Sequence, residues 1–137
     1  MSFTSRARVA VAALIVALPA WAHHSHGNYL KEFIDLEGAV TEVALINPHS
    51  WVFMNVTDDN GQTTEWALEA TNPRALAELG ITDEYIGPGD NVKVRCHPLR
   101  DGGPGCLLGF LQAGDGSIID WDGHGATPTD DGFFDLR

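Results

Sequence analysis

The stretch "LEGAVTEVALINPHSWVFMNVTDDNGQTTEWALEA", residues 36–70, decides the fold. It contains three β-rich segments with roughly alternating apolar positions, at residues 36–47, 51–57 and 62–70. Asn47 and Pro48 end the first segment, because proline fixes φ and asparagine favours turns. Asn60-Gly61 marks a hairpin between the second and third, since both residues tolerate the positive φ of a type I′ turn. We therefore expect three consecutive strands.

The next segment changes period. In "TNPRALAELG", residues 71–80, Thr71 or Asn72 can cap a helix, Pro73 suits its first turn and Gly80 can end it. Strand patterns return at residues 91–97 and 106–113, and "IID", residues 118–120, is a candidate sixth strand. Three strands, a helix and two strands is the order of an OB-fold.

We therefore expect a mostly β protein with one domain over residues 36–120. Its fold would be an OB-like Greek-key barrel of five to six strands, with one short helix between strands 3 and 4. The predicted core includes Val40, Val43, Leu45, Val52, Trp66, Leu68, Val92, Val94 and Leu108.

Residues 1–22 have the anatomy of a secretory signal peptide. Arg6 and Arg8 precede the apolar run "VAVAALIVALPA", and "AWA" supplies small residues before a cut between Ala22 and His23. The run is too short to span a membrane, so a retained anchor is the less favoured alternative. We expect a periplasmic or secreted protein, exported by a Sec-type signal and not inserted in the membrane after processing.

The charge of the chain restricts its partners. The formal charge is −11, and removing the leader, which holds two basic residues and no acidic ones, brings it to about −13. Such a surface repels nucleic acid and anionic lipid. An exported protein partner remains open, as does the oligomeric state.

Two cysteines, Cys96 and Cys106, suit a disulfide in an oxidising compartment. The intervening "HPLRDGGPG" is a natural hairpin connection, and the alternative is a soft metal site with His97. The acidic segment 121–137, "WDGHGATPTDDGFFDLR", is rich in Gly, Asp, Pro and Thr and lacks periodicity, so we expect a mostly disordered tail.

Several phrases together resemble a family of small exported bacterial proteins of unknown function, the DUF6152 type. They are "AHHS", "GAVTEVALINPHSWVFMNV", the pattern W-x-L-E-x-x-x-P-x-x-L-x-x-x-G, "GPGDNVKV" and "PLRDG". The matching positions are His23, His24, Ser25, Asn47, Pro48, His49, Trp66, Glu69 and Pro73. The family has no established activity, so the resemblance implies no role for these residues. The cysteine pair and the acidic tail depart from its usual pattern.

The N-terminal arm, residues 23–35, carries His23, His24 and His26. If the cut follows Ala22, His23 has a free α-amine, and amine and imidazole together can chelate copper as in a histidine brace. His24 in the second position offers another Cu(II) arrangement, through the amine, an amide and its ring. The alternative is a solvated tail that binds metals only adventitiously.

His49 follows the first predicted strand, where a barrel mouth presents ligands, and Asn47 would point to the same side. If the arm folds back over this rim, His49 and Glu69 could supply the third and fourth ligands. The alternative is structural: turn chemistry explains Asn47, and His49 bonds a loop carbonyl. Glu69 alternates with Trp66 and Leu68, so it is exposed or reaches a loop.

These observations favour a periplasmic binding or accessory module that binds copper, or another transition metal such as zinc, through His23, His24, His26 and His49. Asn47 and Glu69 would lie at the rim of this site. One alternative is an interaction module that docks an exported enzyme or membrane complex and has no metal role. Another is a histidine-brace copper enzyme, which needs the first residue exposed in a fixed geometry. The sequence contains no acyl-transfer triad, nucleophile elbow, phosphate loop or dinucleotide fingerprint.

Overall fold

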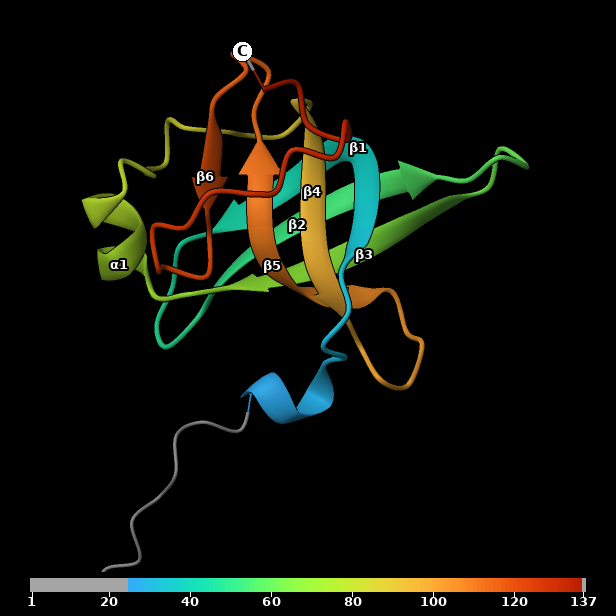
Figure 1. Cartoon of the computed structure of the whole chain (residues 1–137), viewed down its shortest axis with the longest axis horizontal. Coiled ribbons are helices and arrows are strands. Elements are labelled where there is room, and N and C mark those ends of the chain that lie inside the picture. The colour runs from blue at the N-terminus through green and yellow to red at the C-terminus, as the bar shows by residue number, and fades with distance from the viewer. Residues whose placement is uncertain (1–24, 137) are drawn as a thin grey trace, which may run out of the picture.

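A computed structural model describes residues 25–136 of the chain (Figure 1). The elements in chain order are η1 (Ser25–Asn28), β1 (Ile34–Ala44), β2 (Ser50–Thr57), β3 (Thr63–Ala70), α1 (Pro73–Glu78), β4 (Asn91–Pro98), β5 (Gly105–Gln112) and β6 (Ile118–Asp120). The predicted leader and its cleavage point, His23, His24 and the side chain of His26 lie outside the described part.

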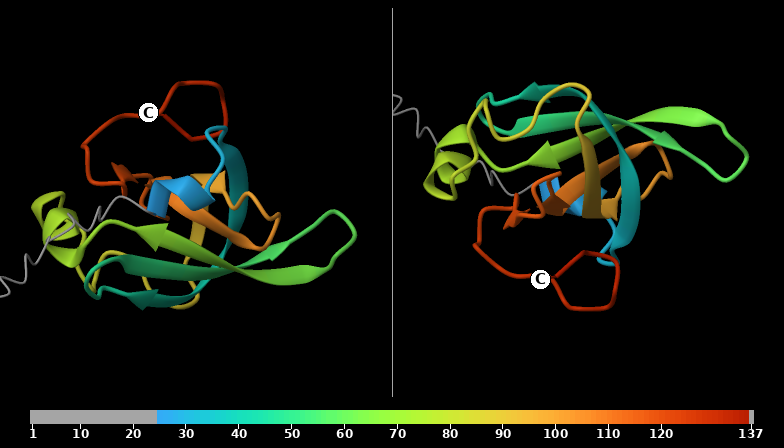
Figure 2. Two further views of the ribbon diagram at one scale, coloured as in Figure 1. Left: turned by 90° about the horizontal axis from the view of Figure 1, so that it is seen from below. Right: turned by 90° about the horizontal axis from the view of Figure 1, so that it is seen from above.

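The strands form a closed five-stranded barrel with β6 as an extra strand. Their order is β3-β2-β1-β4-β5-β6, and a parallel pairing of β3 with β5 closes the barrel. Strand β1 curves across two neighbours, so that residues 34–39 pair with β4 and residues 39–44 with β2 (Figure 2). The single α-helix among the described residues lies between β3 and β4. The prediction of an OB-like barrel is confirmed.

Gly38 lies where β1 passes from one neighbour to the other. A Cβ atom at this position would collide with the backbone oxygen of Asn55 and lie 2.7 Å from Cε of Met54. Glycine therefore permits β1 to approach β2 closely while it pairs with β4. A register shift between Val40 and Glu42 follows two residues later, as expected for a strand that bends around a barrel.

The core follows the predicted alternation with few exceptions. Six of the nine predicted core residues are buried: Val40, Val52, Leu68, Val92, Val94 and Leu108. Val43, Leu45 and Trp66 are only partly buried and pack against the core. Val43 lies opposite the buried Val52, so the register shift after Val40 keeps Val43 on the inner face of the barrel.

The β2–β3 hairpin differs in type from the prediction. Gly61 has φ 79°, whereas Asn60 does not have a positive φ, so the turn is not type I′. The backbone N–H of Gly61 donates to the carbonyl of Asp58, and the Asp58 side chain accepts from the N–H groups of Asn60 and Gln62. In this turn the left-handed position is taken by Gly61 and not by Asn60.

Helix α1 has the predicted ends. The side chain of Asn72 accepts a hydrogen bond of 3.0 Å from the N–H of Ala75, Pro73 opens the helix, and Gly80 follows it with φ 87°. Leu76 is buried and anchors the helix to the barrel. None of the helices within residues 25–136 is long and apolar enough to cross a membrane.

Cys96 and Cys106 form the predicted disulfide, which joins β4 to β5 inside the barrel. Both cysteines of the chain are used, so the alternative of a thiolate metal site with His97 is excluded.

The segment after β6 differs from the expectation of a mostly disordered tail. Residues 121–136 contain neither helix nor strand, yet Trp121 and Phe134 are buried. The backbone N–H of Trp121 donates to the carbonyl of Gly109 and its backbone carbonyl accepts from the N–H of Thr71, while its side chain is fully buried in the barrel core. The composition predicted disorder because Gly and Asp are frequent in this segment. A few aromatic side chains nevertheless bury enough apolar surface to hold the segment against the barrel.

Candidate functional site

The start of β2 and the end of β3 meet at one end of the barrel. In the antiparallel register Trp51 lies opposite Glu69 and Ser50 opposite Ala70, and the Ser50 N–H donates to the carbonyl of Thr71 at 3.1 Å. His49 directly precedes β2, so this register brings it beside Glu69. A cis peptide between Asn47 and Pro48 lies in the loop that leads into the strand.

The His49 ring is held by the Glu69 carboxylate. Nδ1 of His49 lies 2.5 Å from Oε1 of Glu69, and the His49 side chain is 38% exposed. A neutral imidazole in this contact carries its proton on Nδ1 and donates it to the carboxylate. Nε2 is then the ring nitrogen that remains for another ligand.

Tyr29 completes the group, and sequence reasoning missed it. Its hydroxyl donates to Oε2 of Glu69 at 2.5 Å, and the residue is only 6% exposed. Glu69 itself is 8% exposed, and both of its oxygens accept hydrogen bonds. The carboxylate is therefore turned inward, and its geometry favours orienting His49 over serving as a separate ligand. Tyr29 lies within the arm, three residues after His26, where no periodic pattern could have marked it as buried.

Backbone contacts fix the arm that carries Tyr29. Leu30 donates its N–H to the carbonyl of Pro98 at 2.8 Å. Arg100 donates its backbone N–H to Asn28 and its Nε to the carbonyl of Gly27, both at 2.9 Å. The arm therefore lies beside the end of β4 and the loop that joins β4 to β5, below the barrel in the view of Figure 1.

The surroundings of Tyr29 favour its neutral form. Burial raises the pKa of the phenol above its ordinary value, and the hydrogen bond to Glu69 and the nearby charge of that carboxylate raise the pKa further. Tyr29 is consequently a permanent donor to Glu69 at neutral pH, and one oxygen of Glu69 stays committed to it.

The remaining predicted site residues are only partly brought together. Asn47 is exposed in the loop before His49, next to the exposed Ile46. His97 and His124 have other contacts: His97 stacks on Phe33 with ring centroids 4.0 Å apart, and His124 contacts Asp122. Among the side chains of residues 27–136, no three His, Cys, Asp or Glu are grouped so that they could hold a metal ion. The described residues therefore contribute His49 alone as a candidate ligand, supported by Glu69.

The comparisons with known proteins add one finding. The model of a family of unknown function, DUF6152, matches residues 11–108. This match includes the arm, the His49 loop and β3, and it ends within β5, before β6 and the tail. No curated protein and no solved structure matches the chain.

Proposed function

Because the chain belongs to the DUF6152 family, whose function is unknown, its role has to be argued from its own residues, and we propose that it is an exported accessory protein that binds copper. In this proposal residues 1–22 are removed on export. The metal is then held by His49 and by histidines of the new N-terminus, with zinc as the second candidate metal.

The observation that carries the proposal is the bond between His49 and Glu69. Histidines that bind metals commonly donate their second ring N–H to a carboxylate, which fixes the tautomer and makes the ligating nitrogen more basic. His49 has this arrangement, with Nδ1 on a buried carboxylate and a partly exposed ring. The contact also explains why a carboxylate is buried at the end of β3, where an apolar residue would cost less free energy.

Chain length supports the participation of the arm. Tyr29 bonds to the same carboxylate as His49, and His26 and His23 precede it by three and six residues. An extended chain spans at most about 3.6 Å per residue. The Cα atom of His26 can therefore be no more than roughly 11 Å from that of Tyr29, and the Cα atom of His23 no more than roughly 22 Å. A terminus attached at this point is within reach of Nε2 of His49.

The proposed ligands also suit copper. An α-amine and imidazoles are nitrogen ligands that Cu(II) prefers, and copper forms the tightest complexes of the divalent series. The acidic surface, with a formal charge of −11 for the whole chain, raises the local concentration of cations.

The test uses protein exported with its own leader, whose intact mass defines the terminus. Cu(II) and Zn(II) are titrated into the wild type, the His49→Ala variant and the His23→Ala/His24→Ala variant. His124→Ala is the matched control, because it removes one exposed imidazole that contacts Asp122 and not Glu69. We expect both site variants to bind more weakly than the control. Equal affinity in all four proteins would end the proposal, and a loss in the arm variant alone would remove His49 from it.

A further inference from the structure

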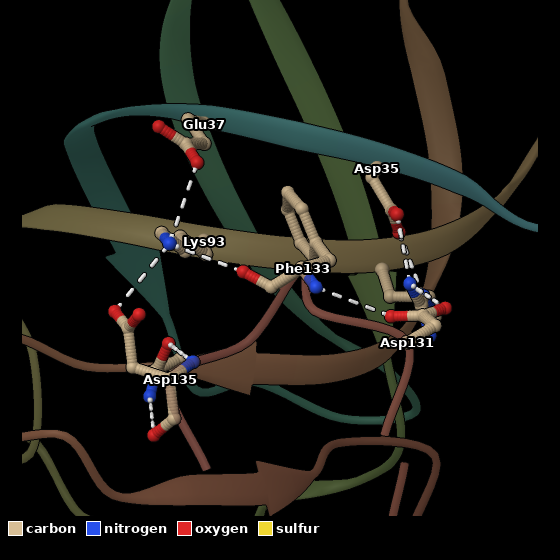
Figure 3. Close-up of polar contacts among 8 residues, drawn as sticks. Asp35, Glu37, Lys93, Asp131, Phe133 and Asp135 are labelled. Carbon is tan, nitrogen blue, oxygen red and sulfur yellow. Dashed lines mark hydrogen bonds and ion pairs between the residues drawn. The ribbon is translucent and has the colours of Figure 1, made fainter. Parts of the chain in front are cut away.

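Two cations lie beneath the acidic tail. Lys93 and Arg95 alternate with buried residues of β4, so both point to the outer face of the barrel. Each cation also has a carboxylate of β1 beside it: Glu37 lies 3.6 Å from Nζ of Lys93, and Asp35 lies 2.7 Å from Nε of Arg95. Figure 3 shows the tail residues Asp131, Phe133 and Asp135 gathered over it.

Arg95 contacts one acidic and two aromatic side chains of the tail. Its Nη2 lies 2.7 Å from Oδ2 of Asp131, and its guanidinium carbon lies 5.6 and 5.3 Å from the ring centroids of Phe133 and Phe134. Arg95 is only 7% exposed as a result. A guanidinium that pairs with a carboxylate and packs on aromatic rings uses both of its recognition modes at once.

Lys93 and Gln112 hold the backbone of the tail. Nζ of Lys93 donates to the carbonyl of Phe133 at 3.1 Å and lies 3.4 Å from Oδ2 of Asp135. The Gln112 amide donates to the carbonyl of Asp135 and accepts from its N–H, both at 3.1 Å. This reciprocal pair resembles one rung of a β-ladder and would accept any extended backbone.

The receiving side is built into the barrel. Asp35 of β1 accepts from Nε and Nη2 of Arg95 at 2.7 and 2.8 Å, so the guanidinium stays oriented without the tail. By contrast, the tail has no helix or strand, and several of its residues from 129 onward are exposed. The DUF6152 match also ends at residue 108, before the tail begins.

We propose that Asp35, Lys93, Arg95 and Gln112, the tail-acceptor surface, form a docking site for an extended acidic-aromatic segment of an exported partner protein. Residues 131–135, Asp-Gly-Phe-Phe-Asp, are the built-in competitor that occupies this site until the partner displaces it. An open groove of about 810 Å³, lined by Lys93, Gln112 and Asp135 among others, adjoins the surface and offers contacts to a longer segment. The strong negative charge of the chain disfavours a second copy as the partner. The site is independent of the proposed metal site.

The test uses the full chain with a weakened tail, the Asp131→Ala/Phe133→Ala/Phe134→Ala variant. The probe is a synthetic peptide of residues 127–137, added to ¹⁵N-labelled protein and followed by amide chemical shifts. We expect saturable shifts at Lys93, Arg95 and Gln112. Binding to the wild type should be weaker, because its own tail competes at a millimolar effective concentration, and the reduction should approximate one plus the ratio of that concentration to the peptide Kd.

Controls separate this site from non-specific binding. A peptide with the same three alanine substitutions should not bind, and adding Arg95→Ala to the weakened-tail variant should abolish the shifts. If the triple variant loses the amide pattern of the barrel, the single Asp131→Asn variant, which keeps both rings, replaces it. A folded variant that shows no shift with millimolar peptide would overturn the proposal, as would equal binding to the wild type. Concentration-dependent dimers of the wild type would overturn the assignment to another protein and indicate tail exchange between copies.

Discussion

The Glu69 carboxylate lies 2.5 Å from the His49 ring, and its other oxygen accepts the Tyr29 hydroxyl. One buried side chain thereby joins three segments that are distant in sequence: the arm, the loop before β2 and the end of β3. Because these bonds lie where the barrel is little exposed, each should contribute measurably to stability and to the orientation of His49.

Replacing Tyr29 with phenylalanine should destabilise the fold. The change leaves the aromatic ring in place but deprives a buried carboxylate oxygen of its donor, which costs about 1–3 kcal/mol. Urea unfolding at neutral pH measures the difference. Tyr85→Phe is the control, since Tyr85 bonds the partly buried Ser117 instead of a buried charge, and its smaller loss should be about 1 kcal/mol. A Tyr29 variant as stable as the wild type would contradict the account.

The advantage of Tyr29 over phenylalanine should shrink at alkaline pH. The folded state raises the pKa of Tyr29 above its ordinary 10.0, so the native protein holds this proton more tightly than the unfolded chain. The Tyr29 hydroxyl makes its full contribution to the free energy of unfolding below about pH 10. This contribution is lost as the pH rises from there toward the pKa of Tyr29 in the folded protein. Urea unfolding of both proteins across this range should show the free-energy gap narrowing. A free-energy gap that widens as the pH rises would show that folding lowers the pKa of Tyr29 and does not raise it.

Glu69→Gln should weaken metal binding while leaving the barrel folded. Glutamine can still accept from Tyr29 but no longer presents a charged acceptor to His49, and loss of such a support typically lowers metal affinity about 10–100-fold. Glu65→Gln on the same strand removes an equal charge at an exposed position that contacts Thr41, so its affinity should match the wild type. Equal affinities in both variants would remove Glu69 from the site.

Gly38→Ala should destabilise the barrel strongly. The added methyl group would meet the backbone of Asn55, which cannot move without breaking the β1–β2 ladder, and overpacking of this kind costs about 1–3 kcal/mol or more. Gly114→Ala is the matched control, since nothing lies within 4 Å of its added Cβ, and it should change the unfolding free energy by less than about 0.5 kcal/mol. Equal midpoints in thermal unfolding would refute the close approach of β1.

The fold could be predicted because local signals and topology agreed. Alternating apolar residues placed the strands, and the Asn72-Pro73 start and Gly80 end placed the helix. The β1 register shift could not be predicted, because it depends on how the strand bends between two neighbours. The turn type also differed, because the Asp58 side chain competes for the N–H groups of the loop.

The candidate site was predictable only in part. His49 and Glu69 were both identified, but their direct bond depends on the β2–β3 register. Tyr29 was missed because it lies 40 residues from Glu69, and a single aromatic residue in an arm has no periodicity to reveal its burial. The docked tail was missed for a similar reason, since its anchor Arg95 lies on a strand of the barrel.

The most direct test of the central claim is Cu(II)-induced broadening of amide signals in the exported, processed protein. A paramagnetic ion bound by the terminus and His49 should broaden the signals of His49, Ser50 and Glu69 at about one equivalent, because copper affinity is concentrated in such nitrogen sites. The signals of Asp59 and Asn60, in the turn at the opposite end of β2 and β3, should remain sharp. Broadening restricted to the N-terminal arm, with His49 unchanged, would contradict the claim that the barrel contributes to the metal site.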